Sequence, residues 1–326
     1  MIELLKKLLA PIGPTGMEGA VAAAITEEIK DYADEIKTDA LGNLIAVKHG
    51  KGPNPKKIMF SAHMDHIGFI VTGVEKEGYL RVASVGGVGI PVSRTRHVTF
   101  VNGVHGVVVK EPKEGPDMFK DLFIDIGAQD KEDALSMVSI GDVAVYAGDV
   151  FPLGKNRWAS PAMDDRCACA LLAKLLQTVG DTQDTVIAVF SVQEEVGCRG
   201  ARVASFAMEP DIGIALDVTG WGDTPGTTQP EIKLGEGIAV KIMDRGSISN
   251  PALREELLVC GEKAGVKTQR EVLPYGGTDA SAMQTSRGGI PVCTISIPCR
   301  YVHSACEVID MRDMDAGLKL LQEYLK

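Results

Sequence analysis

The sequence predicts an α/β fold: a mixed, mainly parallel sheet with helices on both faces, interrupted by a β-rich, barrel-like insertion. After Gly154, helix-like and strand-like segments alternate, which is typical of a parallel sheet covered on both faces. The start of the chain has segments of the same kind, whereas the stretch between these two parts consists of short Val- and Gly-rich runs. We therefore expect an α/β domain from residues 1–66 and 155–326, and an insertion over residues 67–154.

The first 66 residues predict two helices followed by three strands. The helix at the start is amphipathic, and Gly19–Tyr32 keeps apolar side chains near helical spacing. Two of the strands are expected at Leu44–Val47 and Lys57–Ser61. This order is typical of the opening of an α/β sheet.

The insertion consists of short Val- and Gly-rich runs separated by turn residues, a pattern that indicates a small barrel or sandwich. The clearest runs are Phe69–Thr72, Val98–Val101, Val104–Val109 and Val143–Tyr146. Only Lys131–Val138 has a helical pattern within this range.

The alternating segments after the insertion fall into two groups. Helices are expected at Cys167–Thr178, Pro251–Ala264, Ala280–Thr285 and Met311–Leu325. Strands are expected at Thr185–Val192, Asp211–Asp217, Val266–Glu271 and Ile290–Ile297.

Composition excludes several classes of function. The chain has 326 residues, of which 45% are apolar and 24% charged, as in an ordinary globular protein. A net charge of −10 without a basic run argues against nucleic acid or an anionic membrane as a partner. We find neither the apolar stretch of a signal peptide nor one long enough for a membrane helix. Seven cysteines, all beyond residue 166, suit a reducing compartment, so we expect a cytoplasmic protein with Cys167 and Cys169 as buried free thiols.

Residue types that bind metals or transfer protons follow the predicted strands or open a predicted helix. In an open α/β sheet, such residues gather beyond the carboxyl ends of the strands. They are His63, Asp65, Asp164, Asp165, Glu194, Glu195, Asp217 and His303.

Five of these residues form a plausible ligand set for two divalent metal ions. They supply two imidazoles and three carboxylates: His63, Asp164, Glu195, Asp217 and His303. Three carboxylates and a bridging hydroxide would neutralise four positive charges, and one carboxylate would bridge ions about 3.5 to 4 Å apart. Such a pair lowers the pKa of a bound water from about 15.7 toward about 7. The set therefore predicts a hydrolase with two metal ions.

Two further acids have expected roles beside the metals. Glu194 is a candidate general base, able to accept a proton and pass it to a leaving amine. Asp65, two positions beyond His63 in an extended chain, could hold the second imidazole nitrogen and fix its tautomer.

Each residue also has a structural interpretation. Either histidine could be an ordinary structural residue, the adjacent glutamates a solvated turn, and Asp164 and Asp165 helix caps. Their joint placement after apolar strands favours the site. The remaining histidines, His49, His66, His97 and His105, are expected to be structural, although His66 adjoins the site.

Six stretches of the chain also carry a family resemblance. They are residues 62–69, 156–157 with 162–166, 192–197 with 199–201, 215–219, 276–280 and 297–304. With these stretches in register, the sequence resembles family forty-two of the metallopeptidases, the tetrahedral aminopeptidases, which are related to glutamyl and deblocking aminopeptidases. The resemblance implies a phosphorylase/hydrolase-like fold, a dimerisation insertion, and dimers that assemble into a twelve-subunit particle.

The resemblance also implies a role for each ligand. Asp164 would bridge the two metals, His63 and Asp217 would bind one, and Glu195 and His303 the other, with Glu194 as the general base. Two departures from the family pattern, Ala168 and His66, remove no ligand, but His66 could alter the charge of the site. Mixed imidazole and carboxylate ligands suit zinc or cobalt, and manganese is a further candidate.

Three functions are therefore considered for the chain. The first is an aminopeptidase that removes the first residue of peptides with a free amine. The second is a glycoside hydrolase of the endoglucanase type, a label that some family members carry. The third is a catalytically silent scaffold that self-assembles. Segments 273–278 and 235–237 are expected to line the substrate pocket.

Overall fold

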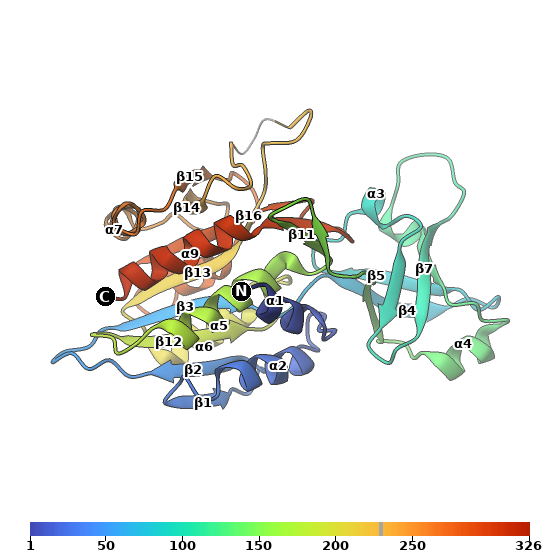
Figure 1. Ribbon diagram of the computed structural model, residues 1–326. Helices are drawn as coiled ribbons and strands as arrows, with labels where there is room; N and C mark the ends of the chain where they lie inside the picture. Colours follow the sequence, from blue (N-terminus) through green and yellow to red (C-terminus); the bar gives the residue numbers. More distant parts are fainter. Residues whose placement is uncertain (228–230) are drawn as a thin grey trace.

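The chain folds into a large sheet and a barrel that lies beside it (Figure 1). The computed structural model describes every residue except 228–230. The large sheet has eleven strands, and the barrel is closed and formed by β4, β5, β8, β7, β6 and β9 in that order. The predicted α/β class is confirmed, and the insertion is a barrel rather than a sandwich.

The large sheet is mixed, with its parallel strands at the centre. Its main order is β1-β2-β12-β3-β13-β16-β17-β11-β10, and β14 and β15 branch from β16. Strands β12, β3, β13 and β16 are mutually parallel, whereas the strands that flank them on both sides are antiparallel. The strands are β1 (Glu35–Thr38), β2 (Leu44–Lys48), β3 (Lys57–His63), β10 (Phe151–Leu153), β11 (Arg157–Ser160), β12 (Thr185–Ser191), β13 (Ile212–Thr219), β14 (Ile238–Met243), β15 (Thr268–Val272), β16 (Val292–Arg300) and β17 (Glu307–Asp310).

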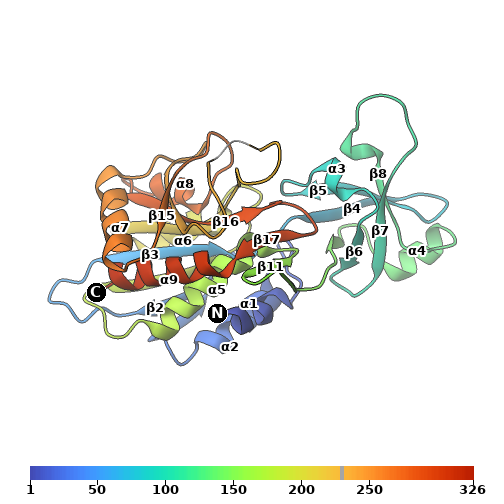
Figure 2. The same ribbon diagram turned by 45° about the horizontal axis from the view of Figure 1, so that its top comes forward.

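Helices cover both faces of this sheet, which is why its central strands are almost continuously apolar. On one face, five helices pack in a single hydrophobic core: α1 (Ile2–Leu9), α2 (Gly19–Ile29), α5 (Met163–Thr178), α7 (Pro251–Lys263) and α9 (Met311–Tyr324). Figure 2 shows α1, α2, α5 and α9 in front of the sheet. On the other face, α6 (Arg199–Met208) and α8 (Asp279–Gln284) pack against a second core.

The barrel has a hydrophobic core of its own, built around Phe69 and Phe100. All of its neighbouring strands pair antiparallel. They are β4 (Gly68–Val74), β5 (Leu80–Val85), β6 (His97–Phe100), β7 (His105–Lys110), β8 (Leu122–Asp125) and β9 (Val143–Tyr146), accompanied by α3 (Ile90–Ser93), η1 (Phe119–Asp121) and α4 (Lys131–Met137). Strand β10 falls within the range 67–154 that the sequence assigned to the insertion, yet it pairs with β11 in the large sheet.

Several short elements were not predicted from the sequence. They are β5, β8, β10, β11, β14, β17, α3, η1 and α6. Most are strands of three to six residues that lack the Val- and Gly-rich runs by which other strands of this length were predicted. Among the described residues, no helix combines the length and the apolar character needed to cross a membrane.

Candidate functional site

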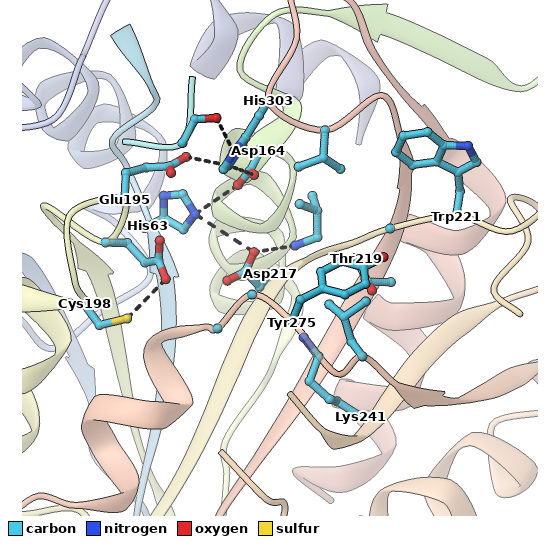
Figure 3. A pocket seen from close by; sticks show the side chains of 18 of the residues that line it. His63, Asp164, Glu195, Cys198, Asp217, Thr219, Trp221, Lys241, Tyr275 and His303 are labelled. Atoms are coloured by element: carbon cyan, nitrogen blue, oxygen red, sulfur yellow. Dashed lines mark hydrogen bonds and ion pairs between the residues drawn. The ribbon is translucent and has the colours of Figure 1, made fainter. Parts of the chain in front are cut away.

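The five predicted metal ligands meet at one edge of the large sheet. His63 ends β3, Asp217 lies in β13, Glu195 follows β12 and His303 follows β16, while Asp164 begins α5. Because these strands are parallel, their carboxyl ends share that edge. All five side chains line a cavity of about 710 Å³ (Figure 3).

The Asp164 carboxylate lies between the two histidines. Its Oδ1 is 3.0 Å from His63 Nε2, and its Oδ2 is 3.2 Å from His303 Nε2. Each imidazole also has a second acid: Glu195 Oε1 is 3.2 Å from His303 Nε2, and Asp217 Oδ1 is 4.0 Å from His63 Nε2. The site is thus two imidazole and carboxylate pairs that share one carboxylate.

The cluster contains more buried carboxylates than its two histidines can neutralise. Burial raises the pKa of Asp217 well above the usual carboxyl value, although His63 opposes the shift. Burial acts in the same direction on Asp164, but the adjacent imidazoles of His303 and His63 lower its pKa overall. Burial would lower the pKa of His63, yet Asp164 and Asp65 raise it well above the usual value. A bound cation would stabilise this arrangement.

Buried oxygens without partners indicate where cations fit. Asp164 Oδ1, Asp165 Oδ1 and Glu195 Oε1 are buried and accept no hydrogen bond from any described residue. Ligand atoms of His63, Asp164 and Glu195 lie within 4.8 Å of one another, as do those of His63, Asp165 and Asp217. Imidazole and carboxylate are the donors that divalent zinc, cobalt or manganese accepts. The residues present therefore fit a pair of divalent metal ions.

Asp65 contacts three parts of the site at once. His63 Nδ1 lies 3.0 Å from the Asp65 carbonyl oxygen and 3.5 Å from its Oδ1, so the closer contact is to the backbone. The carboxylate accepts hydrogen bonds from the backbone N–H groups of Glu194 and Glu195, at 3.0 and 3.2 Å. Thr15 Oγ1 donates to the same carboxylate at 2.8 Å. Asp65 therefore orients the segment that carries both glutamates as well as the imidazole.

Glu194 lines the cavity beside the ligands, and among the described residues neither histidine forms an ion pair with it. Burial raises its pKa well above the usual glutamate value; the carboxylates of Asp217 and Glu195 add to the shift, and His63 opposes it. Glu194 Oε1 also accepts a hydrogen bond from Cys198 Sγ at 3.2 Å.

The sequence reasoning missed two buried charged residues of the site. Glu307, at the start of β17, accepts hydrogen bonds from the backbone N–H groups of Asp164, at 2.9 Å, and His303, at 2.7 Å. Lys241 lines the cavity from β14 and lies 3.2 Å from Glu271 Oε1. Both lie on short strands that the pattern did not reveal; only the closeness of Glu307 to His303 in sequence could have suggested it.

His66 and one of the two predicted pocket segments lie outside the cavity. His66 does not line the cavity; it faces a separate pocket, where burial and Arg166 lower its pKa to about 3. Burial and Arg166 favour the neutral ring, and the expectation that His66 could alter the charge or the substrate preference of the site stays a prediction. Leu273 and Tyr275–Gly277 line the cavity as expected, whereas Gly235 and Gly237 line a different pocket.

The remaining histidines and the thiols of Cys167 and Cys169 do not line the cavity. His49 pairs with Glu35 at the surface, and His97 contacts His105 on the barrel at 3.0 Å. All seven cysteines are free, and Cys167 and Cys169 are buried, as expected.

Comparison with known proteins identifies the family. A family model described as M42 glutamyl aminopeptidase matches residues 42–320. A relative from Acetivibrio thermocellus, named as a candidate aminopeptidase, is 46% identical over 100% of this chain and 98% of its own length. The lysyl aminopeptidase of Pyrococcus furiosus is 38% identical over 99% of this chain and 96% of its own.

Solved structures agree with this assignment. The TET1 peptidase of Pyrococcus horikoshii, described as able to assemble into a tetrahedron or a large octahedral shell, superposes with a TM-score of 0.89. It is 34% identical, with 99% of this chain and 98% of the other covered. The geometry of the site, the family match and these relatives agree that the chain belongs to the M42 family of aminopeptidases.

Proposed function

We propose that the enzyme removes the first residue from peptides with a free amino end, using two divalent metal ions and Glu194 as the general base. The observation that carries this proposal is the Asp164 carboxylate, whose two oxygens face one imidazole each. A carboxylate shared in this way is the feature that a two-metal hydrolase requires of its bridging ligand.

The same geometry supports the ligand assignment. His63 and Asp217 would hold one ion, His303 and Glu195 the other, and Asp164 both. When bound, the two ions would activate a water molecule and polarise the carbonyl group of the scissile bond. Zinc and cobalt suit these ligands best, and manganese is a further candidate.

The chain's own residues complete the reaction. Glu194 accepts the proton of the attacking water and delivers it to the leaving amine. Burial raises the pKa of Glu194 above the usual glutamate value, which makes its carboxylate a stronger base. Asp65 keeps Glu194 in place through the backbone N–H and keeps the His63 imidazole oriented.

The cavity offers a place for the first side chain of the substrate. Beyond the ligands its walls combine apolar side chains with the polar groups of Glu194, Cys198, Thr219, Thr227 and Lys241. The apolar lining residues are Val218, Trp221, Leu273, Tyr275 and Val302. This pocket supports a peptide substrate. A glycoside hydrolase would leave the two histidines between the acids without a function.

The decisive experiment is mass spectrometry of a peptide pool in which each sequence has a free and an acetylated amino end. We expect stepwise loss of single residues from the free-amine peptides alone, abolished by a chelator and restored by divalent metal. Cleavage inside acetylated peptides, or cleavage that a chelator leaves unchanged, would contradict the proposal.

Glu194→Gln tests the general base. We expect it to retain its metal content and to lose about 10²- to 10⁴-fold in turnover, because a positioned base contributes that much. Glu27→Gln is the matched control, since Glu27 is exposed and pairs with Lys30 at the surface. Full turnover in Glu194→Gln would refute the assigned role.

We also propose that the chain self-associates, through the barrel, into dimers and then a particle of twelve subunits. A related solved structure, PhTET1-12s, is described as a dodecamer, and the Pyrococcus horikoshii TET1 peptidase as able to form a tetrahedron; both support this proposal. The seven free thiols support a reducing, cytoplasmic location.

A further inference from the structure

A free thiol lies directly beside the proposed general base. Cys198, at the N-terminal end of α6, lines the same cavity and is 8% exposed. Its Sγ lies 3.2 Å from Glu194 Oε1 and 3.4 Å from the carbonyl oxygen of Thr278. Figure 3 shows the thiol in the cavity wall, joined to that carboxylate by a dashed line. A small solute in the cavity can therefore reach both atoms.

The carboxylate of Asp279 is a second buried acid near this thiol. Asp279, at the start of α8, accepts hydrogen bonds at its Oδ2 from Ser61, at 2.6 Å, and from Ser191, at 2.5 Å. Its other oxygen, Oδ1, is buried and accepts no hydrogen bond within the part of the chain that the structure describes. Asp279 is 2% exposed, so this oxygen is shielded from bulk solvent.

These three residues have the geometry of a metal site. A carboxylate oxygen of Glu194, one of Asp279 and the Cys198 sulfur all lie within 4.8 Å of one another. Outside residues 228–230, no Lys or Arg side chain pairs with either carboxylate. One sulfur and two oxygens attract a borderline or soft divalent cation such as Zn²⁺ or Cd²⁺. The expected co-catalytic ligands contain no sulfur, so the two kinds of site differ in chemistry.

We propose that Glu194, Cys198 and Asp279 form a third, inhibitory zinc site. The ion binds as the thiol releases its proton to solvent, since a thiolate is the form that ligates metals. Bound there, it occupies the carboxylate that must accept the proton of the attacking water, and turnover stops. The inhibitory effect rests on the proposed role of Glu194, whereas the binding of the metal does not.

Cadmium titration monitored by ultraviolet absorption tests the binding. A cadmium–thiolate bond gives a charge-transfer band, and cadmium held only by nitrogen and oxygen does not. We expect one equivalent of this band when Cd²⁺ is added to the manganese-loaded wild-type enzyme. Cys198→Ala should abolish it, and Cys306→Ala, which removes the exposed thiol, should keep it. A band of equal size in Cys198→Ala would overturn the site.

Inhibition of peptide cleavage by excess zinc tests whether metal at this site stops turnover. For each variant, the zinc concentration that halves its own uninhibited rate is measured. Loss of an outer-shell partner already costs a metal site about 10- to 100-fold in affinity, so loss of the Cys198 ligand should raise this concentration at least about tenfold. Asp279→Asn should raise it as well, with thermal unfolding showing that the variant is folded.

The outcomes separate this proposal from the proposed function. An enzyme inactive on every peptide would still show the cadmium band, which would support the site while removing the proposed activity. A band in the wild-type enzyme together with an unchanged zinc midpoint in Cys198→Ala would overturn the inhibitory role of the site.

Discussion

At the scale of single residues, the candidate site depends on acids that bind no metal themselves. Glu307 is 2% exposed and accepts the backbone N–H groups of both Asp164 and His303, so one carboxylate positions two of the proposed ligands. Burial, together with the charge of Asp164, raises the pKa of Glu307 to about 8. Such a partner fixes the orientation of a ligand at the expense of its own solvation.

Glu307→Gln should therefore weaken metal binding without removing a ligand. An amide can accept only one of the two hydrogen bonds, and its NH₂ group then faces a backbone N–H. We expect metal affinity to fall by about 10- to 100-fold, measured by competition with a chromophoric chelator. Glu27→Gln should leave the affinity unchanged, and an equal affinity in Glu307→Gln would mean that the contact does not orient the ligands.

His66 should make the fold sensitive to acid. Its pKa is lowered to about 3 by burial and by Arg166, whereas a histidine in the unfolded chain titrates near about 6.5. Between these values the unfolded state binds more protons, so stability is lost as the pH falls below about 6.5, at roughly 1.4 kcal/mol per pH unit. The loss should appear as a lower unfolding midpoint at pH 5.5 than at pH 7.

Replacement of His66 by Gln removes this titration. The difference between the denaturant midpoints at the two pH values should shrink in His66→Gln. His49→Gln is the control, because His49 lies at the surface, where it pairs with Glu35. An unchanged pH dependence in His66→Gln would assign acid sensitivity to other groups.

At the scale of elements, the sequence predicted the site residues that follow the long strands and missed those that lie on short strands. The ligands from His63 to His303 were found because each follows a long apolar run or opens a helix. Lys241 and Glu307 were missed because these charged residues interrupt or begin the short apolar runs of β14 and β17. Their burial is a property of the assembled sheet, which no local pattern records.

Helix α6 shows how an element adjusts the site without touching the ligands. The side chain of Asn43 accepts the backbone N–H of Val192 and donates to the carbonyl of Gly200, each at 3.0 Å. It thereby ties the start of α6 to the end of β12, from which the segment with Glu194 and Glu195 continues. A methyl group on Gly200 would lie 2.5 Å from the Val192 carbonyl oxygen and 2.6 Å from its nitrogen, so the backbone would have to move.

Gly200→Ala should therefore destabilise the protein and disturb the two glutamates. We expect a loss of about 1 to 3 kcal/mol, as for overpacking in a core, together with reduced turnover. Gly19→Ala is the matched control: nothing lies within 4 Å of the added methyl group in α2, so stability should rise by up to about 1 kcal/mol. Equal thermal stability of the two variants would show that α6 is free to shift.

At the scale of the whole molecule, the barrel has features of an interaction module. It has its own core, and it adds none of the proposed metal ligands to the cavity. Its surface nevertheless carries many large apolar side chains, and such exposure on a soluble protein marks interaction sites. These side chains are Tyr79, Val92, Val101, Val107, Met118, Leu135 and Ile140. Figure 1 shows α4, which carries Leu135, at the end of the barrel away from the large sheet.

If this surface joins subunits, charge placed on it should break the particle. The native mass by light scattering is expected to be twelve times the 34.7 kDa of one chain. The double variant Leu135→Lys with Ile140→Lys should reduce it, because burying two ammonium groups in an apolar contact costs several kcal/mol. Phe206→Lys is the control, since Phe206 is 65% exposed on α6, outside the barrel. A smaller particle in the control, or an unchanged mass in the double variant, would place the subunit contacts elsewhere on the chain.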